Sequence, residues 1–228
     1  MVRALLTMRW EDVCFAHWPV DPGVVAPTLP EGLTVDTRGG DAYLGIVGFR
    51  MRSIRPRGVP IGRSFPELNL RTYVRGDDGE GVYFYNLDAA DRIGVTVARG
   101  LFRLPYYRAE MRVDDRADGV RLRSRRLHRA APPARFDATY RPETPATPVE
   151  SDSLAAFLTE RYRFYTESDG GRLYRGEIAH PRWELSDAAL SIRENTLFEA
   201  NGFDLPDGDP LVHYSPGSDV TAGLISRL

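Results

Sequence analysis

The sequence contains no lysine, and this absence restricts its chemistry more than any other feature of its composition. All 30 residues in the combined lysine and arginine count are arginines. An enzyme that forms a Schiff base with a carbonyl substrate needs an amine, so no side chain of this sequence supports that mechanism. Arginine offers instead a permanently charged planar fork that fits carboxylate or phosphate. A GC-rich genome would produce the same bias, but the chemical consequence holds whatever the cause.

The sequence also has a single cysteine, no long apolar run and a small net charge. Cys14 is the only cysteine, which excludes an intrachain disulfide and favours a reducing compartment. No apolar run approaches the roughly 20 residues needed to span a bilayer, and the N-terminal MVRALLTMRW lacks a signal-peptide core. The net charge of −2 gives no drive toward nucleic acid or anionic membrane. We therefore expect a cytoplasmic protein that binds neither nucleic acid nor membrane.

The common catalytic and cofactor motifs are missing as well. There is no GxSxG elbow, no phosphate-cradling glycine loop and no GxGxxG. His17, His180 and His213 lack the HxH or HxxxH spacing of paired zinc ligands, so we expect structural histidines, no metal and no cofactor. The basic run RLRSRRLHR (121–129) has no interleaved aromatics and has acidic neighbours, which favours a solvated outer strand over a phosphate-binding one.

The residues that are present predict a β-rich fold. The hydrophobic content of 42% and aromatic content of 11% suffice for a sizeable core. Alternating patterns predict strands over residues 10–20, 33–37, 43–55, 68–75, 82–87, 106–114, 120–128, 134–140, 161–166, 172–179 and 183–192, with short strands at the end. The turn RGGD predicts a hairpin between 33–37 and 43–55.

Helical signals are fewer. Helices are predicted over residues 21–26, from Asp88 or Asp91 to Pro105, over 153–160 and near 194–200. In the second helix, Ile93, Val97 and Leu101 recur at intervals of four. The proline-rich segment 142–148 is a linker candidate, but it does not convince as a domain boundary. We therefore predict one mainly β domain over residues 1–228, of the α+β class, with two or three helices.

The stretch FPELNLRTYVR (65–75) alternates strictly between two sets of side chains. Glu67, Asn69 and Arg71 fall on one face of the predicted strand, about 6.5–7 Å apart, and leucines fall on the other. If the polar face points outward, these are ordinary solubilising residues. If it points into a closed barrel, they form the wall of a binding site, where Arg71 would take an anionic group.

The stretch VARGLFRLPYYRAEM (97–111) resembles a segment of the acetoacetate decarboxylases. In that family an arginine is followed six residues later by a proline and then two lysines, the first of which is the Schiff-base nucleophile. Arg99 and Pro105 keep this spacing, but Tyr106 and Tyr107 replace the lysines. A phenol cannot form an imine, so the decarboxylase mechanism does not carry over. Tyr106, in the nucleophile's position, would act as hydrogen-bond donor or general acid.

Nearly the whole chain resembles the uncharacterised YqjF-like proteins. The matching segments include FAHWPVDP (15–22), LPEGL (29–33), FPELNLRTYV (65–74), GVYFYNLDA (81–89), ARGLFRLPYY (98–107), LTERYRFYT (158–166) and HPRWEL (180–185). The resemblance implies an acetoacetate decarboxylase-like fold, a cone-shaped and mainly antiparallel β-barrel around an interior pocket. It also implies that Glu67 corresponds to a family glutamate.

These observations give a set of candidate site residues and three hypotheses. The candidate catalytic residues are Glu67 and Tyr106, and the candidate ligand-binding residues are Asn69, Arg71, Arg99, Tyr107 and His17. We expect Arg99 to be partly buried with an acidic partner, Glu67 or Glu110. The leading hypothesis is a pocket for a small anionic or carbonyl-bearing metabolite, with acid–base chemistry of the lyase, isomerase or hydrolase type. The alternatives are a ligand sensor or carrier without catalysis, and a protein-interaction module; a homo-oligomer is compatible with each.

Overall fold

The computed structural model describes residues 4–168 and 170–228, without the side chains of residues 92–94, 97 and 98. The strands are β1 (Leu6–Val20), β2 (Thr34–Val35), β3 (Ala42–Pro56), β4 (Arg63–Gly76), β5 (Gly79–Ala89), β6 (Tyr106–Arg116), β7 (Gly119–Arg126), β8 (Arg135–Pro142), β9 (Thr147–Pro148), β10 (Arg163–Glu167), β11 (Leu173–Ala179), β12 (Glu184–Asn195), β13 (Leu211–Ala222) and β14 (Ser226–Arg227). The helices are α1 (Pro22–Val25), α2 (Arg92–Phe102) and α3 (Leu154–Thr159), with 3₁₀ turns η1 (Ala26–Thr28) and η2 (Glu199–Asn201).

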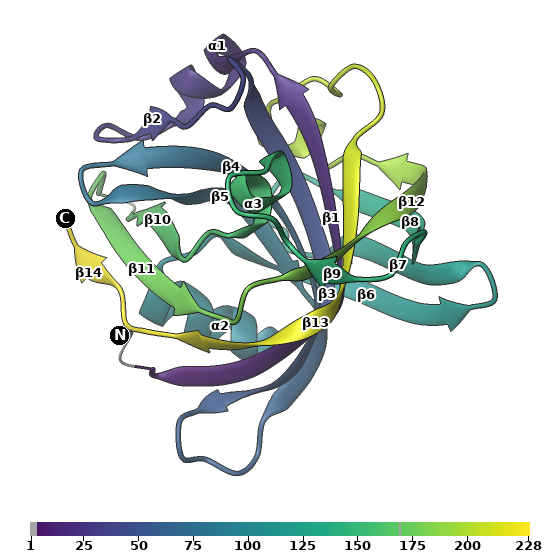
Figure 1. Ribbon diagram of the computed structural model, residues 1–228. Helices are drawn as coiled ribbons and strands as arrows, with labels where there is room; N and C mark the ends of the chain where they lie inside the picture. Colours follow the sequence, from purple (N-terminus) through teal and green to yellow (C-terminus); the bar gives the residue numbers. More distant parts are fainter. Residues whose placement is uncertain (1–3, 169) are drawn as a thin grey trace.

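Hydrogen-bonded strand pairs close two rings that share one wall (Figure 1). One ring runs from β5 through β4, β3, β1, β13, β11 and β10 and returns to β5. The other ring runs from β5 through β6, β7, β8, β12, β13, β1, β3 and β4 and returns to β5. The pairings within both rings are antiparallel, except that β5 pairs in parallel with β6 and with β10. The mainly antiparallel, β-rich fold expected from the sequence is therefore confirmed.

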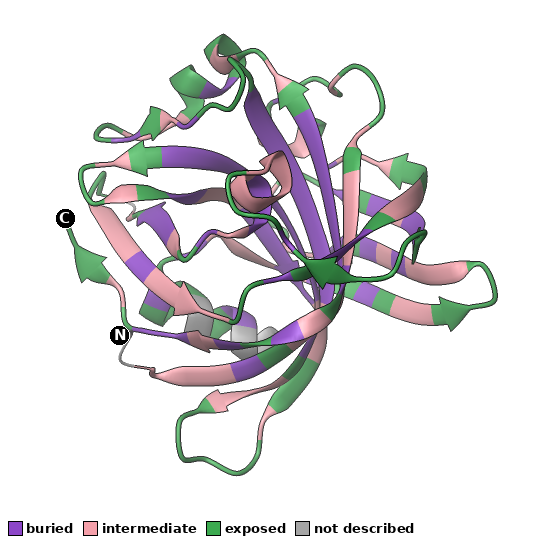
Figure 2. Cartoon of the chain, viewed as in Figure 1, coloured by how far each residue is buried: buried purple, intermediate pink, exposed green. Residues whose placement is uncertain are grey.

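Within the shared wall, the central parts of β1, β3 and β4 are buried on both faces, as Figure 2 shows. Side chains of a strand alternate between its two faces, so each of these strands contributes to both rings. On β4, Leu68 and Leu70 face the ring that contains β7 and β8, where they belong to the largest apolar cluster. The alternation of residues 65–75 is therefore a division between two interiors, and residues 67–74 are buried on both faces of the strand.

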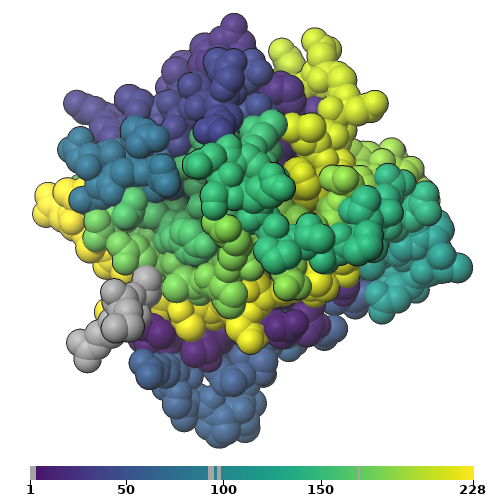
Figure 3. Space-filling model, in the orientation of Figure 1, coloured from purple at the N-terminus to yellow at the C-terminus, as the bar shows by residue number. Residues whose placement is uncertain are grey.

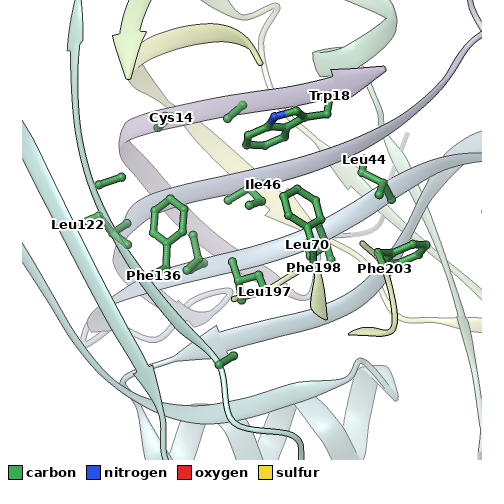
Figure 4. Close-up of a cluster of buried hydrophobic side chains, with 14 of the residues drawn as sticks. Cys14, Trp18, Leu44, Ile46, Leu70, Leu122, Phe136, Leu197, Phe198 and Phe203 are labelled. Atoms are coloured by element: carbon green, nitrogen blue, oxygen red, sulfur yellow. The ribbon is translucent and has the colours of Figure 1, made fainter. Parts of the chain in front are cut away.

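The second ring is filled with apolar side chains and forms a solid core. Figure 4 shows Cys14 and Trp18 of β1, Ile46 of β3 and Leu70 of β4 packed together. The opposite side of this core is supplied by Leu122, Phe136, Leu197, Phe198 and Phe203. Burial of this kind contributes about 25 cal/mol per Å² of apolar surface and accounts for much of the driving force for folding. Because this ring is solid, the interior space of the molecule lies in the other one.

The short helices begin where their sequence signals predicted. The Asp21 side chain accepts a hydrogen bond from the Gly23 backbone N–H (2.7 Å), and Pro22 takes the first helical position of α1. Ser153 caps α3 in the same way through the Ala156 N–H (3.0 Å). Helix α2 occupies the predicted position, although the side chains of Ile93, Val97 and Ala98 lie outside the described ones.

Two local predictions were wrong. The turn at residues 38–41 forms, with a bridge between Arg38 and Asp41, but β2 pairs with β4 and not with β3. The Asp36 side chain, next to β2, forms an ion pair with Arg75 of β4 at 3.1 Å, which stabilises the pairing of β2 with β4. The helix predicted near residues 194–200 is the end of β12 followed by the single turn η2. After it come the long strand β13 and the short final strand β14.

Three of the four arginines of β7 lie at or near the molecular surface, and the fourth, Arg126, is buried. Figure 3 shows the hairpin of β6 and β7 projecting at one side of the molecule, while the α3 segment covers the middle of the face in view. Arg121, Arg123 and Arg125 form ion pairs with Asp137, Asp114 and Glu110. Their charges are thus matched by neighbouring carboxylates. Across residues 4–168 and 170–228, no helix combines the length and apolar character that crossing a membrane requires.

Candidate functional site

The first ring encloses a cavity of about 410 Å³. Most of its wall is apolar, and the aromatic members are Trp10, Phe15, Phe49, Phe65, Phe84, Phe102, Tyr106, Phe164 and Trp183. The polar members are Arg55, Arg63, Glu67, Asn69, Arg71, Asp91, Thr159, Arg161, Arg163 and His180. A concave apolar site with a few convergent polar groups is the usual form of a small-molecule site.

The polar face of β4, which was predicted to be either a solvent-exposed surface or the wall of a binding site, lies on the cavity wall. Glu67, Asn69 and Arg71 are all buried, with exposed fractions of 3%, 3% and 7%. Their neighbours across the sheet on β3 are Phe49, Val47 and Gly45, so the polar row lies beside an apolar one. The structure therefore brings these three residues together on one wall, facing the interior.

Glu67 and Tyr106 form a hydrogen-bonded pair inside this cavity. The Tyr106 hydroxyl donates to Oε2 of Glu67 at 2.9 Å. Burial raises the pKa of the Glu67 carboxyl to about 7, although its hydrogen bonds with Tyr106 and Asn69 lower it in part. Burial and the neighbouring Glu67 raise the pKa of Tyr106 well above its ordinary value. At neutral pH the phenol of Tyr106 is therefore protonated, and the Glu67 carboxyl is present in both its protonated and its ionised form.

The tyrosine pair after Pro105 is divided between the two faces of β6. Tyr106 enters the cavity, whereas Tyr107 lies over the Arg126 guanidinium, 4.5 Å from the ring centroid, and against His128. Adjacent residues of a strand point to opposite faces, so only one of the two could reach the cavity. Tyr107, a candidate ligand-binding residue, is not part of the cavity wall.

Arg99 does not have the environment expected for it. The side chain is exposed on α2, and its Nη1 donates to the Tyr106 backbone carbonyl at 2.7 Å. It makes no ion pair with Glu67 or Glu110 among the described contacts; Glu110 pairs instead with Arg125. The prediction of a partly buried arginine with an acidic partner was wrong, because this part of α2 faces solvent. Arg99 lies outside the cavity wall and supports the start of β6.

Arg71 is a buried cation without a counter-charge. Its Nη2 donates to the Leu158 carbonyl at 2.9 Å and to the Tyr73 hydroxyl at 3.2 Å. The guanidinium also lies over the ring of Phe15, 5.8 Å from its centroid. No carboxylate of the described residues is within ion-pair distance of Arg71, and its Nε has no hydrogen-bond partner among them. An unmatched charge of this kind is costly to bury.

Other buried arginines show the usual arrangement. Arg126 and Asp88 form a doubly hydrogen-bonded pair at 2.8 and 2.9 Å, with both side chains 1% exposed. Arg161, also in the cavity wall, binds Asp36 at 2.8 Å. Even Arg63, whose side chain is largely exposed, pairs with the buried Asp91. The isolated guanidinium of Arg71 is thus exceptional among the buried arginines that the structure describes.

His17 lies behind the cavity wall. Its Nε2 is 2.6 Å from the Tyr73 hydroxyl, which in turn donates to the Leu158 carbonyl at 2.7 Å. Burial, with Arg71 and His213 nearby, lowers the pKa of His17 well below its ordinary value, so the ring is neutral at pH 7. His17 contacts the neighbour of Arg71 rather than the cavity itself. It is therefore placed to position Tyr73 and Arg71.

The remaining histidines and the lone cysteine are not arranged as a metal site. His180 reaches the cavity wall and its Nδ1 lies 2.7 Å from the Pro181 carbonyl, while burial lowers the pKa of both His180 and His213. In the described part of the chain, no cluster of three or more His, Cys, Asp or Glu side chains is arranged to hold a metal ion. Burial raises the pKa of the Cys14 thiol to about 12.

Sequence reasoning missed several parts of this site. Tyr73 shares the strand face of Arg71, and that parity would have revealed it. Arg161 and His180 come from segments far along the chain, and no local pattern marks them as cavity residues. The sequence also did not predict which aromatic residues line the cavity, because aromatic residues that face a cavity and those that face a solid core follow the same periodicity.

Comparison with solved structures identifies the fold as that of the acetoacetate decarboxylase-like enzymes. The enduracididine biosynthesis enzyme MppR, complexed with pyruvate, has a TM-score of 0.67 at 13% identity, covering 100% of this chain and 91% of that one. Acetoacetate decarboxylase from Legionella pneumophila has a TM-score of 0.65 at 10% identity, covering 98% of this chain and 88% of that one. The predicted fold class is therefore confirmed.

The family can be stated more narrowly. The family of uncharacterized conserved proteins termed DUF2071 matches residues 7–219 of this chain. The uncharacterized protein YqjF of Bacillus subtilis (strain 168) is 41% identical over 219 residues, which are 95% of this chain and 89% of that relative. The chain belongs to the DUF2071 family, and its resemblance to the YqjF-like proteins is confirmed.

Proposed function

We propose that the protein binds a small carboxylate-bearing metabolite in the interior cavity and carries out acid–base chemistry on it without a Schiff base. The observation that carries the proposal is the unmatched guanidinium of Arg71 in the same wall as the hydrogen-bonded Glu67–Tyr106 pair. The cavity combines a site for negative charge with a proton donor and acceptor. For acid–base chemistry on a bound carboxylate, Arg71 and the Glu67–Tyr106 pair must contact the same ligand molecule.

A bound carboxylate would supply the missing partner of Arg71. Two hydrogen bonds, to a backbone carbonyl and to a phenol, both engage Nη2 and leave the buried Nε without a partner among the described residues. Carboxylates bind guanidinium through two parallel hydrogen bonds, which are stronger than those between neutral groups. Apolar walls around the site exclude water and strengthen this attraction. The cost of burying Arg71 is thus offset when the ligand is present.

The Glu67–Tyr106 pair suits proton transfer at a carbon next to a carbonyl. A carboxyl with a pKa of about 7 is effective as a base near neutral pH, and the neutral phenol donates to a carbonyl or enolate oxygen. The absence of lysine excludes a side-chain imine. MppR was solved with pyruvate, an α-keto acid, so a compound with carboxylate and carbonyl groups is known to bind that protein of the same fold.

Binding is tested by isothermal titration calorimetry with hexanoate and 8-oxononanoate. We expect both to bind the wild type, and Arg71→Met to weaken binding at least about tenfold because the charged fork is removed. Arg125→Met is the matched control, since Arg125 pairs with Glu110 on the exposed surface. Equal affinity of the Arg71 variant and the wild type would overturn the proposal, and so would a wild type that binds neither acid.

Turnover is tested separately with 8-oxononanoate, whose ketone is separated from its carboxylate by six carbons, by following the exchange of the protons next to the ketone for deuterium by NMR. We expect exchange with the wild type and its loss in Glu67→Gln, while the buffer-catalysed rate serves as the baseline. Binding without enzyme-dependent exchange would refute the acid–base part and leave a carrier or sensor function.

A further inference from the structure

We infer that the ligand is an elongated amphipathic carboxylate, whose carboxylate lies at Arg71, whose carbonyl or hydroxyl lies at Glu67 and Tyr106, and whose acyl or aryl body extends toward the opening. This inference rests on the proposed function and names its ligand class. It follows from the size of the cavity, the order of side chains along it, and the position of its opening.

The cavity is too large for a short keto acid. An apolar cavity of about 150 Å³ holds one benzene molecule, which has six non-hydrogen atoms. By this proportion a cavity of about 410 Å³ holds roughly sixteen such atoms. Pyruvate also has six, and it would leave most of this space without contacts. A ligand that fills the cavity needs an additional body of about ten atoms.

The strand register gives the order of residues along the cavity. Arg71 of β4 is paired with Gly45 of β3, and Glu67, four residues before Arg71, is paired with Phe49. At the usual rise these two pairs are about 13 Å apart along the strand. The guanidinium is also directed away from Glu67, since it binds Tyr73 and Leu158. One ligand that reaches both groups must therefore be elongated.

The wall beyond Glu67 is apolar. Phe65 pairs with Met51 at the next level, and further along Leu6 pairs with Pro56 on one side and Ala222 on the other. Apart from Arg55, Arg63 and Asp91 and the indole N–H of Trp10, the side chains that line this part of the wall are apolar. An acyl or aryl body would bury its surface here, which is favourable in proportion to the apolar area removed from water.

The opening lies at this apolar end. The lining residues Arg63 and Leu101 are 54% (side chain) and 49% exposed, whereas Thr159 and Arg161, which line the cavity at the Arg71 end, are buried. The Arg71 end is closed by α3 and the residues after it, through Leu158, Thr159 and Arg161, which Figure 1 shows lying across the ring. A ligand therefore enters with its carboxylate first, and its apolar body stays nearest the opening.

The first experiment measures affinity along a series of unbranched carboxylates, from butanoate through hexanoate and octanoate to decanoate. We expect the affinity of the wild type to rise about fourfold for each added methylene, as burial of a methylene predicts. All members should depend on Arg71 to the same degree, because they share the carboxylate. Affinity that is flat or falls along the series would overturn the inference.

The second experiment shortens the cavity. Ala222 lines the wall at the level of Leu6, far from Arg71 along the register, and Ala222→Leu adds bulk there. We expect the variant to bind hexanoate like the wild type but decanoate at least about tenfold more weakly, since more than one methylene loses its place. A thermal melt and the retained hexanoate affinity establish that the variant is folded. Equal losses for both acids would contradict the predicted orientation.

The outcomes separate the two proposals. If short acids bind and depend on Arg71, but affinity does not increase with chain length, the proposed function stands and the ligand class is wrong. If no member of the series binds, or binding ignores Arg71, the proposed function itself fails.

Discussion

The Tyr106 hydroxyl donates a hydrogen bond to the Glu67 carboxyl at 2.9 Å, across the space between β6 and β4. This bond favours the ionised form of Glu67, whereas burial opposes it more strongly. The same bond holds the proton on Tyr106. Each residue thus sets the protonation state of the other, and changes to one should be measurable at the other.

Tyr106→Phe should raise the pKa of Glu67 above its wild-type value of about 7, because a hydrogen bond to the charged form is lost while burial remains. The pKa is measured by NMR from the side-chain carboxyl carbon shift of Glu67. Tyr107→Phe is the matched control, since Tyr107 lies on the other face of β6 against Arg126. A Glu67 pKa that is unchanged in Tyr106→Phe, or equally changed in the control, would show that the hydrogen bond does not stabilise the carboxylate.

Glu67 should also make stability depend on pH. Its pKa is raised from the ordinary 4.5 to about 7 in the folded protein, so its protonated form stabilises the fold below pH 4.5 and this stabilisation is lost as the pH rises to about 7. The loss corresponds to about 3 kcal/mol for a pKa difference of this size. In Glu67→Gln the group cannot ionise, and this part of the pH dependence should disappear.

The measurement is the free energy of unfolding in urea at several pH values between 4.5 and 8 for both proteins. Subtracting the variant from the wild type removes the contributions of histidines and other carboxylates, which the two proteins share. We expect the difference to change in favour of the variant as the pH rises, and to level off above about pH 7. A difference that is constant with pH would mean that Glu67 titrates alike in the folded and unfolded chains.

Substitution by methionine should raise the free energy of unfolding at Arg71 and lower it at Arg126. Removing Arg71 leaves no carboxylate unpaired, and the Leu158 carbonyl keeps its hydrogen bond from Tyr73, so the free energy of unfolding should rise by about 1 kcal/mol. Removing Arg126 leaves Asp88 buried without its partner, which should cost about 3–5 kcal/mol. Urea unfolding of the ligand-free proteins compares the two directly. An Arg71 variant as destabilised as the Arg126 variant would show that Arg71 has a structural rather than a ligand-binding role.

Much of the local structure could be predicted because short-range signals control it. The alternation in residues 65–75 fixed which β4 side chains share a face, and the Asp21 and Ser153 caps located two helices. The alternation did not reveal that both faces are interior. That depends on β7 and β8 covering the leucine face, a contact between distant segments with no local signal.

The errors and omissions have the same origin. The RGGD turn forms as predicted, yet β2 joins β4, because the ion pairs of Asp36 with Arg75 and Arg161 involve residues far apart in sequence. Arg99 was expected to be partly buried because it lies beside Val97 and Leu101 on the predicted helix, but the tertiary position of α2 leaves it exposed. Pairing partners and solvent exposure are set by the assembled rings, and local periodicity does not encode them.

Gly45 should be required for the arrangement behind the cavity wall. A Cβ at this position would lie 2.7 Å from Cδ2 of His17, 3.1 Å from its Nε2 and 3.4 Å from the Tyr73 hydroxyl. Gly45→Ala should therefore displace the His17 ring and cost about 1–3 kcal/mol in the free energy of unfolding, as overpacked interiors do. Because Tyr73 accepts a hydrogen bond from Arg71, the variant should also bind hexanoate more weakly.

Gly100→Ala is the matched control, since an added Cβ would have no neighbour within 4 Å and the residue lies in helix α2. This control should be neutral or more stable by up to about 1 kcal/mol, because alanine favours the helix. Urea unfolding and calorimetry with hexanoate measure both effects. If Gly45→Ala is as stable as the wild type, the His17 ring moves aside without cost, and the contact between His17 and Tyr73 does not hold Arg71 in place.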